Sequence, residues 1–326
     1  MTSAPDRFAP PSPSGDGTAD RPRLDGRRIA ILGLGLMGRP MAINLARAGA
    51  DLSVWNRSPA AADEVSAATG AHAAASPAEA AAGADIAIIC VTDTAAVEAV
   101  LFGADGIAAA HPAPRVVIDM GTTDPLATPD IGRRLAEGCG ASLIDAPVSG
   151  GTRGAEAATL SIMAGGEDAA FAAALPVLQV LGSRITRIGG PGAGQVAKAA
   201  NQVVVGVVIQ AVAEALALAE VAGVDPARVR EAMIGGFADG TILRQHGERM
   251  VAGNLVPGGK CRIHLKDMVQ ATRLGDANGL AMPASTLVRD AFARLVEQGR
   301  GELDHSALHL LLTDTFRASG DDVAAR

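Results

Sequence analysis

The chain has 326 residues, of which 48% are apolar and 19% are charged, which is the length and balance of a globular protein with two domains. Its net charge of −7, with acidic and basic residues interspersed, excludes a basic surface for nucleic acid and disfavours binding to anionic membranes. No run approaches a membrane span. Small molecules are therefore the expected partners.

Three cysteines, Cys90, Cys139 and Cys261, lie far apart and show neither CxxC nor Cys/His ligand spacing. We therefore expect no disulfide framework, no metal site and a cytoplasmic location. Residues 1–25 are rich in Pro, Ser, Asp and Arg and contain no apolar segment of a signal peptide. They are expected to form a disordered tail outside the fold.

Residues 28–57 contain the most informative pattern. The short apolar run Ile29 to Leu32 leads into glycines with GxGxxG spacing, and apolar residues then recur at helical spacing as far as Gly49. In such a unit the first glycine allows a tight turn, the second lets a pyrophosphate approach the backbone, and the third lets the helix pack closely on the strand. The pattern predicts a dinucleotide site whose turn consists of Gly33, Leu34, Gly35, Leu36, Met37 and Gly38.

The second strand of this unit, Leu52 to Trp55, ends in Asn56, Arg57 and Ser58. A protein selective for NAD usually has Asp or Glu here to hold both ribose hydroxyls, and this chain has none. Arg57 stands 24 residues after Gly33, close to the usual spacing of the ribose-reading group, and an arginine suits a 2′-phosphate. NADP is therefore the favoured cofactor, and NAD is the alternative. The simplest other interpretation of Arg57 is a solvated arginine on the surface.

Further apolar strand candidates alternate with alanine-rich helical stretches up to the Gly-Gly-Pro-Gly cluster at 189–192. This alternation predicts an open, mostly parallel sheet with helices on both faces. The predicted fold is a Rossmann-type doubly wound α/β domain at 26–190, followed by an all-α domain at 191–326 that begins with a long helix. Strands are expected at Ile86–Val91, Val116–Asp119, Ser142–Asp145, Leu160–Ala164 and Ile185–Ile188, and helices at Gln195–Ala222, Pro226–Ile234, His264–Leu274, Pro283–Glu297 and Ser306–Arg317.

Lys198 lies among valines on the long helix, with Asn201 and Gln202 three and four residues further on and on the same face. A lysine that faces inward in this setting loses its hydration, which lowers its pKa towards the range useful for proton transfer. Helical spacing alone slightly favours another reading. In that reading the lysine stem covers apolar surface while the amine reaches water.

Three other places carry candidate groups. The segment Asp145 to Gly151, DAPVSGG, offers a hydroxyl and consecutive backbone N–H groups that can bind a carboxylate, although by itself it is also an ordinary turn. Thr122 and Thr123 follow a strand end, where open α/β sheets bind their ligands. Lys266 and Asp267 are, alone, most simply an exposed charge pair. The histidines lack metal-ligand spacing, and neither GxSxG nor a P-loop occurs.

Four segments resemble the β-hydroxyacid dehydrogenase family, and they occur in the order and spacing of that family. They are GLGLMGRPMAINL at 33–45, DAPVSGG at 145–151, GAGQVAKAANQ at 192–202 and IHLKD at 263–267. The resemblance extends from Arg28 to about Leu312. Within the family, the chain looks most like the tartronate semialdehyde reductases, through KAANQ at 198–202, IGGFADGTIL at 234–243 and DHSAL at 304–308.

The resemblance implies that Lys198 is the catalytic general acid/base, which reverses the slight preference for a surface role. It implies that the substrate is bound by Ser149, Gly150 and Gly151 on its carboxylate side and oriented by Asn201 or Gln202. We also expect Thr122, by its place after a strand end, and Asp267 to contact the substrate. The resemblance further implies that Val91, Thr92, Thr122 and Lys266 lie at the cofactor.

The expected reaction is the interconversion of a short semialdehyde acid and its hydroxyacid, with tartronate semialdehyde reduction to glycerate first. Chemistry on 3-hydroxyisobutyrate, succinic semialdehyde, glyoxylate or sulfolactaldehyde is the alternative within the family. An imine reductase, which typically lacks this lysine, or a non-catalytic NADP-binding protein would be a different class. The long valine-rich helix also predicts a homodimer or homotetramer.

Two departures from the family pattern affect substrate identity. Gly121 stands where relatives commonly carry serine, which removes a hydroxyl from the expected site. Phe237 stands where close reductase relatives have leucine, and Asp239 stands where they have glycine. These two positions therefore gain an aromatic ring and an acidic group.

Overall fold

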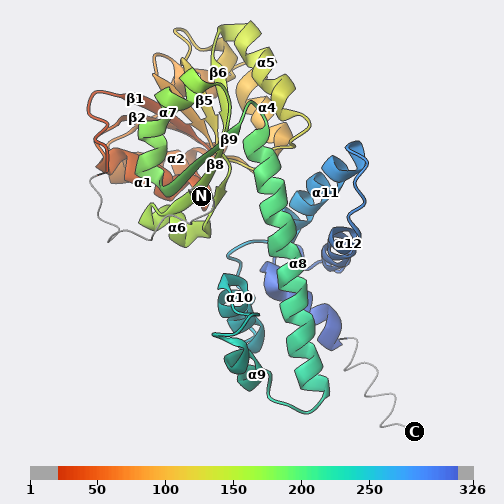
Figure 1. The fold of residues 1–326 in the computed structure, drawn as a ribbon. Coiled ribbons are helices and arrows are strands. Elements are labelled where there is room, and N and C mark those ends of the chain that lie inside the picture. The colour runs from red at the N-terminus through yellow and green to blue at the C-terminus, as the bar shows by residue number, and fades with distance from the viewer. Residues whose placement is uncertain (1–20, 315–326) are drawn as a thin grey trace, which may run out of the picture.

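The computed structural model describes residues 21–314, which form an α/β part and a helical part joined by one long helix (Figure 1). The α/β part contains one sheet of nine strands. The strands are β1 Arg28–Leu32, β2 Asp51–Trp55, β3 His72–Ala73, β4 Ile86–Ile89, β5 Val116–Asp119, β6 Ser142–Asp145, β7 Val148–Ser149, β8 Leu160–Gly165 and β9 Gly182–Gly189.

The strand order is β3-β2-β1-β4-β5-β6-β8-β7, with β9 paired to β8. Strands β1 to β6 are parallel to one another, whereas β8 is antiparallel to β6 and β7. The predicted Rossmann-type sheet is thus confirmed, with two antiparallel pairings, β6 with β8 and β8 with β7, towards its far edge. Because the chain order reverses between β1 and β4, the carboxyl ends of these strands border the crevice in which such sheets bind ligands.

Helices cover both faces of the sheet because the strand side chains alternate. Ile29 and Ile31 of β1 belong to the apolar core on one face, and Ala30 and Leu32 to the core on the other. The helices of this part are α1 Gly38–Arg47, α2 Pro59–Thr69, α3 Pro77–Ala81, α4 Thr94–Phe102, α5 Thr128–Cys139, α6 Gly151–Ala157 and α7 Asp168–Leu181, with the 3-10 turn η1 at Ile107–Ala109.

The long helix α8, Ala193–Val221, runs from the sheet through the helical part, where the remaining helices pack around it (Figure 1). They are α9 Pro226–Met233, α10 Thr241–Val251, α11 Cys261–Ala277 and α12 Pro283–Glu297, with the 3-10 turn η2 at His305–Ala307. Their shared core includes Ile209 and Leu216 of α8 and Phe292 of α12, all fully buried. The predicted long helix is present, with its ends shifted by one or two residues.

The statement that no run approaches a membrane span is wrong for α8, which by length and composition alone is long and apolar enough to cross a membrane, with a mean hydropathy of 2.0. A core helix of a globular protein passes the same test. Several polar side chains on α8 are buried against protein, including Gln195, Lys198 and Gln210. We interpret α8 as such a core helix.

Three other sequence expectations need correction or restriction. The excluded segment 1–25 ends inside the fold, because Leu24 is fully buried and its N–H donates to Ala48 O (2.8 Å). Residues 1–20 lie outside the described residues. Helix α10 was not anticipated. The predicted helix Ser306–Arg317 corresponds to η2 followed by helical residues up to Asp314, and its last residues lie outside the described part.

Candidate active site

The glycine turn after β1 has the shape that a dinucleotide requires. Gly33 has φ +100°, and a Cβ there would lie 2.3 Å from Cys90 O; a Cβ at Gly38 would lie 1.9 Å from Gly33 O. Both positions accept only glycine without a backbone shift. A Cβ at Gly35 would meet nothing within 4 Å, so the approach to this backbone is open. The turn therefore fits a pyrophosphate, which needs that close approach at the second glycine.

The other residues of the turn divide between core and surface. Leu34 is buried, Met37 is half-buried and Leu36 is exposed. Val91 lies beside the turn, because a Cβ at Gly33 would come 2.9 Å from Val91 Cγ1. The hydroxyl of neighbouring Thr92 donates to Asp93 Oδ2 (2.9 Å). The structure thus brings Val91 and the glycine turn together, as expected of residues at the cofactor.

The end of β2 is tied to the same turn. Asn56 Oδ1 accepts a hydrogen bond from Leu34 N (3.0 Å), and its Nδ2 donates to Ser58 O (3.1 Å). Asn56 therefore holds the strand end against the predicted phosphate-binding turn. Arg57 between them is exposed and has no acidic partner among residues 21–314. Its guanidinium is free to meet an anion at this end of the crevice.

Lys198 faces inward, which excludes the surface reading. Its side chain is 8% exposed, and Nζ donates to Val148 O (2.8 Å). Burial lowers the pKa of Lys198, the carboxylate of Asp267 opposes that shift, and the charge of Lys266 adds to it. Val148 precedes Ser149 and the two glycines of the DAPVSGG segment, so the amine lies against this predicted carboxylate-binding turn.

Residues of α8 and α11 meet beside the lysine. Gln202 Nε2 donates to Asp267 Oδ2 (2.6 Å), and Asn201 Nδ2 donates to Gln202 Oε1 (2.9 Å). Asp267 is 4% exposed, and Lys266 Nζ lies 3.0 Å from its Oδ1. The predicted pair Lys266 and Asp267 is therefore mostly buried rather than an exposed charge pair.

Lys266 also joins the helical part to the sheet. Its Nζ donates to Thr122 O (2.7 Å), directly after β5, and Arg273 on the same helix pairs with Asp124 (3.1 Å). The structure thus gathers the predicted substrate residues of three separate segments around Lys198. Their individual roles stay predictions.

Gly121 is more tightly enclosed than a missing hydroxyl would suggest. A Cβ there would lie 2.7 Å from Val91 O and 3.1 Å from Asp119 Oδ1. Neighbouring oxygen atoms therefore fill the space where a side chain would stand, so a serine cannot be added without moving the strand ends.

We expect Gly121→Ser to lower the free energy of unfolding by about 1–3 kcal/mol, the usual cost of inserting atoms into a packed site. The matched control is Gly138→Ser on α5, where a Cβ would meet nothing within 4 Å. Urea unfolding compares the two variants. Equal stability of Gly121→Ser and the wild type would contradict the close packing.

Asp145 and Asp119 are buried carboxylates for which the sequence analysis predicted no role. They are register partners at the ends of β5 and β6. Asp145 accepts Gly192 N (2.8 Å) and Gln195 N (2.9 Å), and so caps α8, whose own N-cap residue has no side chain. Burial raises the pKa of Asp145 to about 6 and also raises that of Asp119. An aspartate that ends each of two neighbouring parallel strands was the available signal.

Models of two domain families match the chain. The NAD-binding domain of 6-phosphogluconate dehydrogenase matches residues 28–190, and the NAD-binding domain of NADP-dependent 3-hydroxyisobutyrate dehydrogenase matches residues 192–312. The 2-hydroxy-3-oxopropionate reductase of Escherichia coli is 43% identical over 281 residues, which are 86% of this chain and 95% of that protein. The chain belongs to the 3-hydroxyisobutyrate dehydrogenase-related family of β-hydroxyacid dehydrogenases.

Solved structures of this family share the whole fold. A 3-hydroxyisobutyrate dehydrogenase from Salmonella typhimurium has 31% identity and a TM-score of 0.79, covering 87% of this chain and 99% of that one. The 3-hydroxyisobutyrate dehydrogenase of Mycobacterium tuberculosis with L-serine has 33% identity and a TM-score of 0.78, covering 88% and 99%. Like other β-hydroxyacid dehydrogenases, this chain is an NAD(P)-dependent oxidoreductase that acts on small molecules.

A second polar cluster lies in the helical part of this β-hydroxyacid dehydrogenase. Among the described residues, His246, Asp304 and His305 place ligand atoms within 4.8 Å of one another. Asp304 already accepts Gly258 N (2.8 Å) and Ser306 N (3.0 Å), and the guanidinium of Arg249 lies 3.8 Å from its Oδ2. We interpret the cluster as structural, because backbone donors and a cation already serve the carboxylate.

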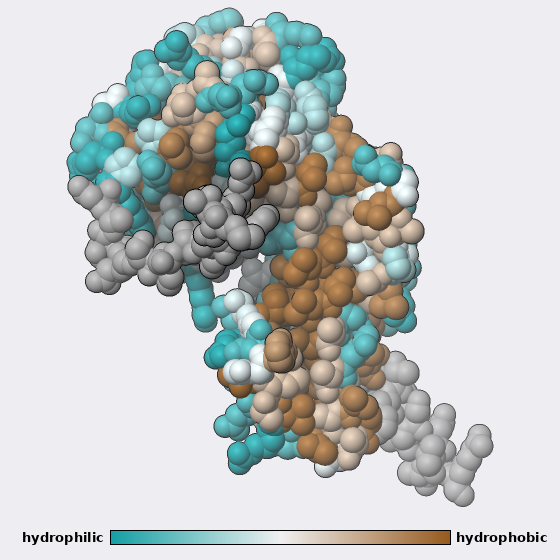
Figure 2. Space-filling model, in the orientation of Figure 1, coloured by the Kyte–Doolittle hydropathy of each residue, from teal (hydrophilic) through white to brown (hydrophobic). Residues whose placement is uncertain are grey.

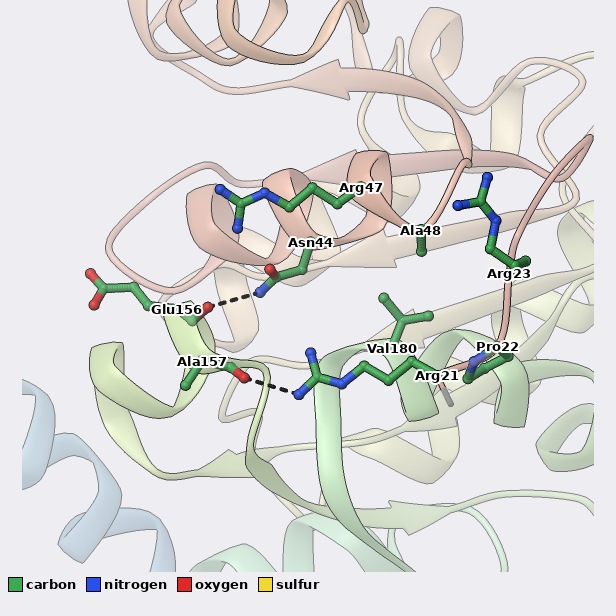
Figure 3. Close-up of a pocket in the computed structure, with 9 residues that line it drawn as sticks. All are labelled: Arg21, Pro22, Arg23, Asn44, Arg47, Ala48, Glu156, Ala157 and Val180. Atoms are coloured by element: carbon green, nitrogen blue, oxygen red, sulfur yellow. Dashed lines mark hydrogen bonds between the residues drawn. The ribbon is translucent and has the colours of Figure 1, made fainter. Parts of the chain in front are cut away.

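A cavity of about 380 Å³ lies away from these groups, beside the last turn of α1 (Figure 3). Its lining includes Asn44 and Arg47 of α1 and Glu156 of α6, whose backbone O accepts from Asn44 Nδ2 (3.4 Å). Helix α1 begins at the glycine turn, and its other end borders the cavity. The cavity is thus separate from the dinucleotide crevice.

Proposed function

We propose that this protein is an NADP-preferring reductase that converts tartronate semialdehyde to glycerate. The observation that carries the proposal is the buried amine of Lys198, bonded to Val148 O and close to the charges of Asp267 and Lys266. The 43% identity to a 2-hydroxy-3-oxopropionate reductase over nearly its whole length supports this substrate.

The bound cofactor would supply a hydride to the carbonyl carbon. In our proposal the backbone from Gly33 to Gly38 holds its pyrophosphate, and Thr122 lies between cofactor and substrate. The N–H groups of Ser149, Gly150 and Gly151 would bind the substrate carboxylate, since consecutive amides in such a turn form an anion-binding concavity. Gly150 has φ +132° and Gly151 φ +60°, which turns the chain sharply at this point.

Lys198 would act on the substrate oxygen. In its protonated form it donates a hydrogen bond to the carbonyl and then a proton to the developing alkoxide. Without substrate the amine donates to Val148 O. When substrate binds, its oxygen would replace Val148 O as the acceptor, so that the amine keeps a hydrogen-bond partner throughout. Asp267, with Gln202 bonded to it, offsets the cost of keeping a buried charge there.

Cofactor preference can be tested at Arg57. We expect Arg57→Ala to weaken NADPH binding about 10- to 100-fold and to leave NADH binding unchanged, because a hydrogen bond to a charged group contributes about 1.5–3 kcal/mol. Fluorescence titration with both cofactors measures the effect. The control is Arg47→Ala, because Arg47 is an exposed arginine at the far end of α1. Tighter binding of NADH than NADPH by the wild type would overturn the preference.

The substrate is tested by NADPH oxidation across a panel of semialdehydes. Tartronate semialdehyde should give the highest kcat/KM, ahead of methylmalonate semialdehyde, succinic semialdehyde, glyoxylate and sulfolactaldehyde. The similarity to solved 3-hydroxyisobutyrate dehydrogenase structures makes 3-hydroxyisobutyrate chemistry the second candidate. Cyclic imines in the same panel test the imine reductase alternative. Activity on none of these compounds would overturn the proposed substrate.

We also propose that the protein forms a homodimer or homotetramer through α8. One stripe of this helix is exposed and apolar except for Glu214, and apolar residues gather along it in Figure 2. A patch of this kind commonly marks a subunit interface. The apolar residues of the stripe, three to seven apart in sequence, are Val196, Ala200, Val204, Val208, Ala211, Leu218 and Val221.

Light scattering tests the assembly. The wild type should have at least twice the mass of one chain, and Val204→Glu should lower it, because Val204 lies mid-stripe and is 62% exposed. Val256→Glu places the same charge at a residue that is 72% exposed but outside α8, and should leave the mass unchanged. A monomeric wild type would contradict the interface.

The three cysteines are free, which fits the cytoplasmic location we propose.

A further inference from the structure

Gln195 lies in the first turn of α8, three residues before Lys198, and its side chain is 1% exposed. Its amide group bonds to the last residue of β5 and to the segment that follows that strand. Oε1 accepts from Thr123 N (3.2 Å), and Nε2 donates to Gly121 O (3.0 Å). Nε2 also lies within hydrogen-bond distance of Asp119 Oδ2 (3.4 Å). One amide therefore holds the backbone on both sides of Thr122.

Thr122 is the residue that this arrangement presents. Gly121 and Thr123 are buried, whereas Thr122 is half-exposed. Its own carbonyl accepts from Lys266 Nζ (2.7 Å). The backbone groups around Thr122 are thus occupied by α8 on one side and by α11 on the other.

The start of α8 cannot slide against the sheet. Asp145 accepts Gly192 N and Gln195 N, one with each carboxylate oxygen. A Cβ at Gly194 would lie 2.4 Å from both Asp145 O and Met163 O, so this turn of the helix rests directly on the backbone of β6 and β8. Lys198, one turn further on, shares that fixed frame.

We propose that Gln195 is a positioning residue, which sets the distance between Thr122 and the amine of Lys198 by bonding to the backbone on either side of Thr122. This inference rests on the function proposed for Lys198. A misplacement of about 1 Å at a reacting centre costs about 100-fold in rate, so the effect belongs in kcat. Gln195 makes no hydrogen bond to the predicted phosphate-binding turn, so its loss should affect kcat far more than NADPH affinity.

The chemistry of the contact requires a donor and an acceptor on one side chain. Thr123 N needs an acceptor, and Gly121 O needs a donor. An ionised carboxylate offers only acceptors and is repelled by Gly121 O and by Asp119, whereas a protonated carboxyl group offers one of each. The titratable groups around this contact are Asp119, Asp145, Cys90 and Lys266.

The test is Gln195→Glu, compared with the wild type as a ratio of kcat values from about pH 6 to about pH 9, below the melting temperature of each protein. Because only the protonated form replaces the glutamine, the ratio should rise towards acid pH. Gln195→Met keeps the volume but loses both hydrogen bonds. It should lower kcat about 10-fold or more at every pH and change the Kd for NADPH less than about 3-fold.

Gln210→Glu is the matched control, since Gln210 is also buried on α8 but bonds to Glu214. Its ratio to the wild type should stay flat. A flat or falling ratio for Gln195→Glu, or a variant that does not fold at any pH, would overturn the positioning role. These outcomes leave the proposed reaction intact if Lys198→Ala is inactive. If Lys198→Ala is active, the proposed reaction fails whatever Gln195 does.

Discussion

Lys198→Ala is expected to lower turnover at least ~100-fold, the lower end of a typical acid–base contribution, while NADPH still binds. The reason is geometric. The buried amine is held at Val148 O, beside the predicted carboxylate turn, and makes no hydrogen bond to the glycine turn that is predicted to hold the phosphates. Steady-state reduction of tartronate semialdehyde gives kcat, and fluorescence titration gives the Kd for NADPH.

Lys198→Arg should be almost as inactive as the alanine variant. Arginine stays protonated and cannot give up a proton, so it can supply charge but not acid–base chemistry. Lys260→Ala is the control, because Lys260 pairs with Glu302 outside this site. A Lys198→Ala enzyme within a few-fold of wild type would contradict the mechanism.

The pH dependence of both reduction and oxidation follows from Lys198. Burial lowers the pKa of Lys198 below its ordinary value of 10.5. Reduction needs the protonated amine, so kcat for reduction should fall as pH rises through this lowered pKa. Oxidation of the hydroxyacid needs the neutral amine as base, so its rate should rise over the same interval.

The centre of the sheet could be predicted from the sequence because its central parallel strands are buried on both faces. Ile86–Ile89 and Val116–Asp119 are buried at every residue, and such runs are distinct from their alanine-rich neighbours. Helix α10 escaped prediction because only Leu243 and Met250 contribute large buried apolar side chains, which is too weak a period to recognise.

The site could be predicted only in part, because its decisive contacts join distant segments. Lys266 and Thr122 are 144 residues apart, and no local pattern relates them. Lys198 was ambiguous for a different reason. Helical spacing places it on a face without saying whether that face meets protein or water, and only the packing of the DAPVSGG turn against α8 decides this.

One compositional signal of the site played no part in the prediction. The 28 basic residues include only three lysines, Lys198, Lys260 and Lys266. A chain that uses arginine almost everywhere else retains lysine where a compact amine or a shiftable pKa matters. Two of the three meet at the candidate site, where arginine could not replace the proposed acid–base group.

Gly35→Ala is expected to weaken NADPH binding about 10-fold or more and to leave the stability of the cofactor-free protein almost unchanged. A Cβ at this position meets no protein atom within 4 Å, so the fold tolerates it. The added methyl group instead occupies the space through which a pyrophosphate reaches the backbone, and a tenfold loss corresponds to about 1.4 kcal/mol. Titration with NADPH and thermal melting of the same samples separate the two effects.

Gly38→Ala provides the opposite case within the same turn. Its Cβ would lie 1.9 Å from Gly33 O, so the helix must move away from the strand and the cofactor-free protein should lose about 1–3 kcal/mol or more. The two alanines therefore distinguish a glycine required by the ligand from a glycine required by the fold. If Gly35→Ala binds NADPH as tightly as the wild type, the pyrophosphate does not lie over Gly35, and the whole assignment of the cofactor to this turn fails with it.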